Sequence, residues 1–207
     1  MNTIDCHTTS IMSKTKLQNL LDFTGMLDAF RRVERVIYVN GADRMENDSE
    51  HSYHLAMLAW YIADAEGLDM DRDLILRYAL VHDIAEVYAG DTYIYSTDMA
   101  LLGSKSERER AALERLEKEF PDFPDLVALA HRYERREDRE SRFVYALDKL
   151  EPVLHILQNE RRIWRDKGIT LEQLIRSKRE KIAISPEIEP YFDELILVLT
   201  AREKELF

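Results

Sequence analysis

The stretch LRYALVHDIAEVYAGDTYIY, residues 76–95, decides how this sequence is interpreted. Apolar residues at helical spacing run up to His82, and Asp83 follows it directly. Glu86 stands four residues after His82, so the two are expected on one helical face, and Asp91 comes next in AGD. The stretch therefore predicts a helix that ends in a compact set of ionisable side chains.

Glycine and proline are scarce on both sides of this stretch. The 207 residues contain 6 glycines and 5 prolines, and neither occurs in 42–66, 68–89 or 125–151. Unbroken stretches of this length favour helices over a turn-rich β fold. The sequence thus predicts an all-α fold, a single-domain multi-helix globule without an internal linker.

Apolar periodicity predicts about eight helices. The first follows a leucine-rich stripe over 17–30, and the second follows Ser49, whose hydroxyl is suited to capping a helix start. The others are expected over about 74–82, 104–119, 125–133, 140–164 with a bend at Pro152, 170–182 and 186–206. Residues 92–95 show a doubtful strand pattern. A flexible tail is predicted over 1–16, before a domain spanning 17–207.

Charge and composition exclude several classes of protein. Asp and Glu number 40 against 29 Lys and Arg, and the formal charge of −11 disfavours binding to a nucleic acid polymer. No apolar run approaches the about 20 residues of a membrane-spanning helix, and the first residues lack the pattern of a signal peptide. A lone Cys6 allows no internal disulfide, which indicates a cytoplasmic protein.

Two histidines and two aspartates form a candidate metal site. His51 and the His82–Asp83 pair each lie at the end of an apolar helical stripe, and Asp148 lies inside the apolar run FVYALDKLEPVL. Burying a carboxylate costs several kcal/mol unless a cation or hydrogen-bond donors meet it. Neutral imidazoles and carboxylates together suit a divalent cation. A salt bridge from Asp148 to a nearby lysine or arginine is the alternative.

The order of these residues resembles a known family. H…HD…D, with spacings of 31 and 65 residues, is similar to the HD-domain superfamily of metal-dependent phosphohydrolases. The blocks ENDSEHSYHLAMLAWYIA, LRYALVHDIAEVYAGDTYIY and YERREDRESRFVYALDKLEP resemble the branch that includes bacterial 5′-deoxynucleotidases. The resemblance extends from about Leu20 to Pro190. It implies one divalent metal ion, which the sequence leaves open among Mn, Co, Fe, Ni, Zn and Mg.

The resemblance also implies roles for single residues. The metal ligands would be His51, His82, Asp83 and Asp148, and Asp83 would also belong to the catalytic set.

Glu86 would handle the proton of the attacking water or of the leaving group, and Asp91 would approach the sugar. Arg35 is the best match to the arginine that meets the phosphate, with Arg32 and Arg44 as alternatives. On the sugar side, TYIYSTD replaces a stretch that contains proline in the nucleotidases, so the sugar preference stays open.

Other histidines and aromatic residues have weaker assignments. His54, three residues after His51, is interpreted either as a core histidine, the role that the sequence favours, or as a partner of a metal ligand. Core positions are predicted for Trp60, Tyr61 and Tyr78. A place in the substrate pocket is considered for Tyr88, Tyr93 and Tyr95.

The predicted activity is hydrolysis of a phosphomonoester, most specifically of nucleoside 5′-monophosphates, and the predicted partner is a small phosphorylated molecule. One alternative is a phosphodiesterase or a pyrophosphohydrolase of alarmone nucleotides. Another is a non-catalytic sensor or scaffold whose metal only staples helices; Glu86, an acid that is not a ligand, argues against it. The family and the frequency of two-fold dimers indicate a homodimer.

Overall fold

The structure, a computed structural model, describes residues 14–158 and 162–207. Within these residues, the eight predicted long helices are present. They are α1 (Lys16–Phe30), α2 (Asp48–Ala65), α3 (Arg72–Val81), α6 (Lys105–Glu119), α7 (Pro124–Arg135), α8 (Arg139–Gln158), α10 (Leu171–Ile182) and α11 (Glu189–Ala201). Short helices join them: α4 (Glu86–Ala89), α5 (Met99–Gly103), α9 (Arg162–Lys167) and α12 (Glu203–Leu206). The all-α prediction is confirmed; residues 1–13 of the predicted tail lie outside the described residues.

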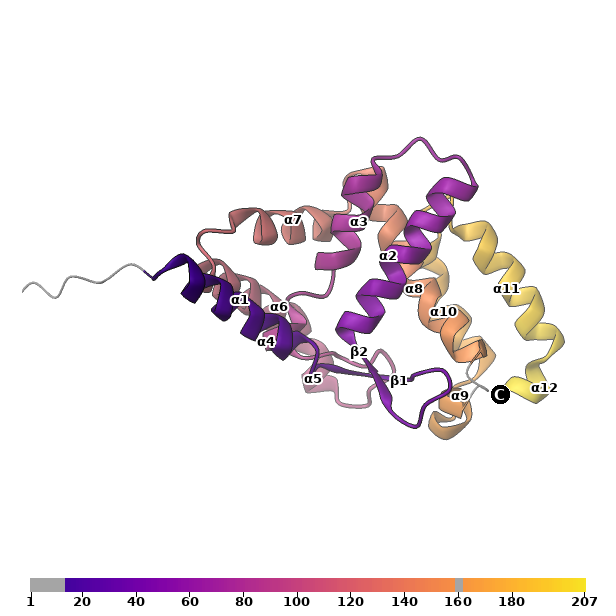
Figure 1. Ribbon diagram of the computed structural model, residues 1–207. Coiled ribbons are helices and arrows are strands. Elements are labelled where there is room, and N and C mark those ends of the chain that lie inside the picture. The colour runs from indigo at the N-terminus through magenta and orange to yellow at the C-terminus, as the bar shows by residue number, and fades with distance from the viewer. Residues whose placement is uncertain (1–13, 159–161) are drawn as a thin grey trace, which may run out of the picture.

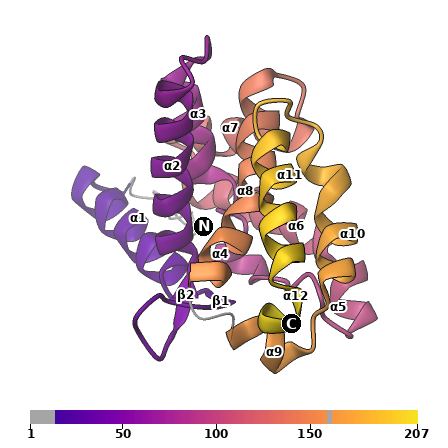
Figure 2. The ribbon, with the colours of Figure 1, turned by 90° about the vertical axis from the view of Figure 1, so that its right-hand side faces the viewer.

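Helix α8 runs through the middle of the molecule (Figures 1 and 2). Helices α2 and α3 pack against it and against each other, and α10 packs against α8 with α11 beside it. Helix α7 lies beside α3, and α6 packs against α4 and α7. The side chains at these contacts are buried, among them Leu55, Tyr78, Phe143 and Leu147. This packing brings together segments about 100 residues apart in the sequence.

Helix α2 begins before the predicted start. Its N-cap is Asn47 rather than Ser49: the Asn47 side chain accepts a hydrogen bond from the Glu50 amide at 3.1 Å. The Glu50 carboxylate in turn accepts one from the Asn47 amide at 3.2 Å. This reciprocal capping box satisfies two amides that the first turn leaves free. It fixes the register of α2 so that His51 is fully buried.

A two-stranded antiparallel sheet adds to the predicted helices (Figure 1). Strand β1 (Glu34–Tyr38) pairs with β2 (Met45–Asn47) across a turn that contains Gly41, whose φ is +76°. Glycine reaches that conformation without the steric cost that other residues carry. Residues 92–95, the doubtful strand of the sequence, form no strand.

The hairpin escaped the sequence analysis for a physical reason. The β-branched Val36 and Ile37 favour an extended chain, but a strand of five residues is too short to show a clear alternation. Its importance lies in the position of Arg35 on β1 and Glu46 on β2. The Asp48 amide donates to the Val33 carbonyl at 3.1 Å, which ties the hairpin to the start of α2.

Helix α3 ends at Val81, and residues 82–85 form a turn before α4. In this turn the Glu86 amide donates to the Asp83 carbonyl at 2.8 Å. The prediction that His82 and Glu86 share one helical face is therefore wrong. The turn instead directs carboxylate oxygens of Asp83 and Glu86 to within 4.8 Å of each other.

The helix predicted over 140–164 is described in two parts. Helix α8 continues through Pro152 to Gln158, and α9 begins at Arg162, with 159–161 outside the described residues. The helix predicted over 186–206 is divided into α11 and α12. The ring of Phe207 stacks on Trp164 with centroids 4.8 Å apart, which ties the C-terminus to α9.

Part of the predicted core lies on the surface. Tyr78 is buried as predicted, whereas Trp60 and Tyr61 on α2 are 50% and 69% exposed. On α1, Leu17 and Leu20 are also mostly exposed. Helical periodicity identifies an apolar stripe, but it does not say whether another part of the same chain covers that stripe.

Candidate metal centre and active site

Four residues from three parts of the chain direct ligand atoms to one point. His51 comes from α2, His82 and Asp83 come from the turn after α3, and Asp148 comes from α8. His51 Nε2 lies 3.1 Å from Asp148 Oδ1 and 4.0 Å from Asp83 Oδ2. His82 Nε2 lies 2.9 Å from Asp83 Oδ2 and 3.9 Å from Asp148 Oδ1. One ligand atom from each residue lies within 4.8 Å of the other three, a spacing that suits a single cation.

The outer nitrogen of each imidazole has its own partner. His82 Nδ1 lies 2.9 Å from the Ala79 carbonyl oxygen, and His51 Nδ1 lies 3.1 Å from Glu151 Oε2. Donation from Nδ1 leaves the lone pair on Nε2, as a metal ligand requires. His82 Nε2 is buried and makes no aligned hydrogen bond to the described residues. The donor set and this unpaired nitrogen both fit a divalent cation.

Asp148 also has the cationic neighbour that the alternative interpretation expected. Its Oδ2 contacts the Lys149 ammonium, while Oδ1 faces His51. Burial by itself raises the pKa of Asp148, but Lys149, His51 and His82 hold that pKa well below its ordinary value. Asp148 is therefore a carboxylate, ready to bind a cation through Oδ1 without losing its salt bridge.

Glu86 is buried beside this group. Burial, Asp83 and Asp91 raise the pKa of its carboxyl to about 10, against the opposing effect of Lys105. Lys105 Nζ lies 3.4 Å from Oε1, and Oε2 has no hydrogen-bond partner among the described residues. Its surroundings therefore favour the protonated acid, which can hold or release a proton next to the four ligands.

Of the three candidate arginines, Arg35 is the one at the site. Its Nη1 lies 3.0 Å from Asp83 Oδ2 and 3.4 Å from Asp48 Oδ1. Arg44 instead pairs with Glu50 on the surface, and Arg32 is exposed and does not line the cavity beside the four ligands. The hairpin that the sequence did not reveal is what holds Arg35 in place.

A cavity of about 460 Å³ opens beside the four ligands. Asp83, Asp148, Glu86, Asp91 and Arg35 all line it. So do further basic side chains that the sequence analysis did not single out: Lys105, Arg136, Lys149, Lys178 and Lys181. The net charge of −11 therefore conceals a local concentration of positive charge, which is what an anionic substrate needs.

The aromatic candidates divide between two places. Tyr93 and Tyr95 line the cavity, with ring centroids 5.6 Å apart. Tyr88 does not line it, and its hydroxyl contacts Glu119.

Acidic residues around the site were also missed. Asp48 and Glu46 are fully buried next to Arg35, and Glu151 is the partner of His51. Glu46 and Asp48 lie in ENDSEH, directly before His51, so proximity in sequence was an available signal. The sequence signal for Glu151 was weaker: it stands three residues after Asp148 on the same helix.

The sequence favoured a core position for His54, and this prediction is wrong. Its side chain is half exposed, and Nδ1 lies 3.9 Å from Glu151 Oε1.

Comparison with known proteins agrees with this geometry. A family model described as the HD domain matches residues 27–189. The 5′-deoxynucleotidase HDDC2 of Xenopus laevis is 32% identical over 146 residues, which are 69% of this chain and 70% of the relative. Its human counterpart, also named 5′-deoxynucleotidase HDDC2, is 32% identical over 69% of each chain.

A solved structure gives the same result. The crystal structure of a predicted metal-dependent phosphohydrolase from Magnetospirillum magnetotacticum MS-1 is 30% identical, with a TM-score of 0.76 over 92% of this chain and 95% of that chain. Fold and site thus define a helical, metal-dependent hydrolase. The chain belongs to the HD domain family, which confirms the predicted family and class of enzyme. No helix among the described residues is long and apolar enough to cross a membrane.

Proposed function

We propose that this protein is a divalent-metal-dependent phosphomonoesterase that acts on nucleoside 5′-monophosphates. One observation carries the proposal: a single cavity is lined by two of the four candidate ligands, Asp83 and Asp148, by the buried acid Glu86 and by a wall of lysine and arginine side chains. The names of the relatives, 5′-deoxynucleotidases, support nucleotides as the substrate class.

The cation would be held by His51, His82, Asp83 and Asp148. When bound, it supplies a Lewis acid and a water of lowered pKa. Two imidazoles and two carboxylates suit Mn, Fe, Co, Ni, Zn or Mg, so availability decides the identity.

Positive side chains bind and orient the phosphate. Arg35 already faces Asp83, and Lys149 contacts Asp148, so both cations lie beside the ligand set. Lys105 and Lys178 extend the positive charge along the cavity wall. Fixed cations of this kind stabilise charge on the phosphoryl oxygens more in the transition state than in the ground state.

Glu86 moves a proton. Because burial favours its protonated form, the carboxyl is suited to protonating the leaving 5′-oxygen and then accepting a proton from the attacking water. Asp91, on the same cavity wall, is assigned to the sugar.

The protein is further proposed to be a cytoplasmic homodimer. The lone cysteine supports a reducing compartment. An exposed apolar strip on α2, which includes Tyr53, Met57, Trp60 and Tyr61, supports association with a second copy. Sedimentation velocity at two concentrations tests the dimer, and an unchanging monomer would contradict it.

A substrate screen tests the function. Chelated protein is supplied with each divalent cation and with ribo- and deoxyribonucleoside 5′-monophosphates, a phosphodiester and a nucleotide with a 3′-pyrophosphate. We expect phosphate release from the monophosphates only after a cation is restored. Hydrolysis of the diester or of the pyrophosphate alone would assign the chain to the alternative enzymes. Bound metal without turnover of any of them would favour the scaffold.

A further inference from the structure

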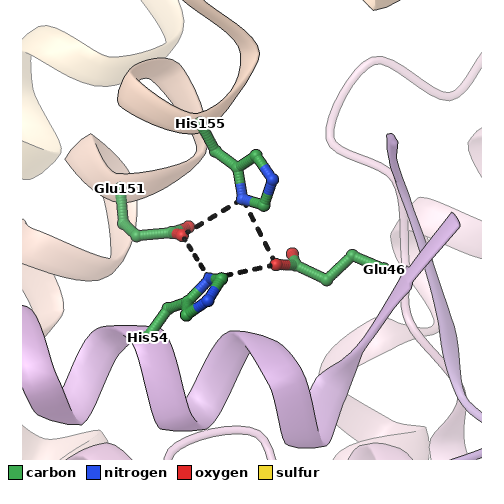
Figure 3. A group of neighbouring side chains, drawn as sticks. All are labelled: Glu46, His54, Glu151 and His155. Atoms are coloured by element: carbon green, nitrogen blue, oxygen red, sulfur yellow. Dashed lines mark ion pairs between the residues drawn. The ribbon is translucent and has the colours of Figure 1, made fainter. Parts of the chain in front are cut away.

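A second group of histidines and glutamates lies outside the cavity of the active site (Figure 3). Glu46 comes from β2, His54 from α2, and Glu151 and His155 lie one turn apart on α8. Each directs one nitrogen or oxygen to a common point, and these four atoms all lie within 4.8 Å of one another. The sequence indicated no partner for His155, and it left His54 between a core position and a role as partner of a metal ligand.

The four side chains alternate around a ring of nitrogen and oxygen atoms. His155 Nδ1 lies 3.3 Å from Glu46 Oε1 and 3.6 Å from Glu151 Oε1. His54 Nδ1 lies 3.7 Å from Glu46 Oε1 and 3.9 Å from Glu151 Oε1. Figure 3 shows both imidazoles and both carboxylates turned toward the middle of this ring.

These separations suit a cation better than hydrogen bonds. Hydrogen bonds from nitrogen to oxygen span about 2.7–3.2 Å. A tetrahedral cation with bonds of about 2.1 Å to nitrogen and oxygen holds neighbouring ligand atoms about 3.4 Å apart. All four nitrogen–oxygen distances in the ring exceed the range for hydrogen bonds, and the two shorter ones, 3.3 and 3.6 Å, bracket the tetrahedral value.

The burial of the Glu46 carboxylate is an independent indication of a bound cation. Glu46 is fully buried, yet neither of its carboxylate oxygens makes a hydrogen bond to the described residues. Arg35 lies 3.5 Å from Oε2, so Oε1 is the oxygen that faces the two imidazoles. A buried carboxylate oxygen without a donor is costly, and a cation at the centre of the ring would remove that cost.

Access to this group is separate from access to the active site. A second cavity of about 830 Å³ is lined by all four residues, none of which lines the active-site cavity. The half-exposed His54 stands at its edge. A cation can therefore enter without passing the substrate pocket.

We infer that Glu46, His54, Glu151 and His155 form a second metal site, which binds Zn²⁺ in tetrahedral coordination. Two neutral imidazoles and two carboxylates give a neutral complex with a divalent cation, the combination that Zn²⁺ accepts in closed sites. Glu151 links this site to the active site, because its Oε2 contacts His51 Nδ1 while Oε1 faces the ring.

Zinc stoichiometry tests the inference. The full chain is stripped with a chelator, reloaded with Zn²⁺, desalted and analysed by mass spectrometry for zinc per chain. We expect two zinc ions in the wild type and one in each of His54→Ala, His155→Gln and Asp148→Ala. His131→Ala is the matched control, since His131 is exposed and pairs with Glu134 at 3.5 Å, and it should retain two.

Cobalt reports the geometry of the second site. In Co²⁺-loaded Asp148→Ala, whose active site no longer holds a cation, the intense visible absorption of a tetrahedral ion should be present, and it should disappear when His54→Ala or His155→Gln is added to that variant. The inference is overturned if Asp148→Ala binds no zinc, or if both histidine variants keep two. These readouts do not depend on turnover, so an inactive protein would refute the proposed function and leave this test intact. His54→Ala also alters an exposed side chain, so folding is not at risk in that variant.

Discussion

The two histidine–carboxylate groups of this molecule resemble each other in ligand type and differ in surroundings. The group around His82 opens into a cavity whose described lining residues include four lysines and two arginines, with Glu86 as an additional buried acid. The group around His155 opens into a cavity where Arg31 is the one lysine or arginine among the described lining residues. Ligands alone therefore do not distinguish a catalytic cation from a structural one. Neighbouring lysine and arginine side chains and the additional buried acid Glu86 make that distinction.

The largest effect is expected for Asp148→Ala. Without this ligand the active-site cation is lost, and because a Lewis acid is worth several kcal/mol, kcat should fall by at least about a thousandfold. Phosphate release and metal content are measured together, with circular dichroism to verify folding. Asp64→Ala, on the exposed end of α2, is the control and should behave as wild type. An Asp148→Ala variant that retains wild-type turnover would remove this residue from the metal site.

Glu86→Gln should reduce kcat by about 10²–10³-fold and leave metal content unchanged, because the amide keeps the shape but carries no proton to transfer. The control is Glu109→Gln, which alters the other carboxylate next to Lys105, at 3.2 Å. If both variants lose activity equally, the role of Glu86 is to hold Lys105 rather than to move a proton.

The ionisation of Lys178 should make kcat/KM depend on pH. Burial and the nearby Lys149 lower its pKa to about 7, so the ammonium is charged below pH 7 and neutral above it. The second ionisation of a phosphate monoester, near pH 6, is complete by then. We therefore expect kcat/KM to fall as the pH rises from about 7 to 9, because the attraction for the phosphate is lost.

Replacing Lys178 with methionine tests whether this side chain causes the decline in kcat/KM. Lys178→Met should lower kcat/KM at pH 6.5 by about tenfold and abolish the decline above pH 7, since one charged hydrogen bond is worth about 1.5–3 kcal/mol. Lys118→Met, on the exposed face of α6, should keep the wild-type profile. A decline that persists unchanged in Lys178→Met would assign it to another group.

The smallest effect on turnover is expected for His54→Ala. This side chain reaches Glu46 and Glu151 but does not line the active-site cavity, so kcat should change by less than about twofold. Added Zn²⁺ should raise the midpoint of thermal unfolding less in this variant than in the wild type, because only the active site still binds the ion. A loss of kcat comparable to that of Glu86→Gln would show that the two groups are not functionally separate.

Sequence reasoning reached one group and missed the other for identifiable reasons. His82 and Asp83 form a His-Asp pair, Asp148 lies within an apolar run, and His51 lies at the end of an apolar helical stripe, so each carries a local signal. His155 carries none and Glu46 carries only its nearness to His51, because the meeting of Glu46 and His155 depends on how β2 packs near α8 across 109 residues. Contacts between segments so far apart leave no periodic pattern in the sequence.

The fold also contains elements that the sequence predicts and elements that it does not. Long helices follow from unbroken apolar periodicity, and the eight expected ones are present. The hairpin, the turn at 82–85 and the exposure of Trp60 depend on contacts between elements, and each differs from its prediction. Family resemblance selected Arg35 as the arginine that meets the phosphate, and the structure places Arg35 on the cavity wall through a strand that was not predicted.

The central claim is that a cation held by His51, His82, Asp83 and Asp148 makes this cavity a phosphomonoesterase of nucleotides. The most direct measurement is phosphate release from nucleoside 5′-monophosphates by chelated wild-type and Asp148→Ala protein, before and after addition of a divalent cation. We expect no release by either protein before addition, and restored release by the wild type alone. Release that is insensitive to chelation, or restored equally in Asp148→Ala, would contradict it.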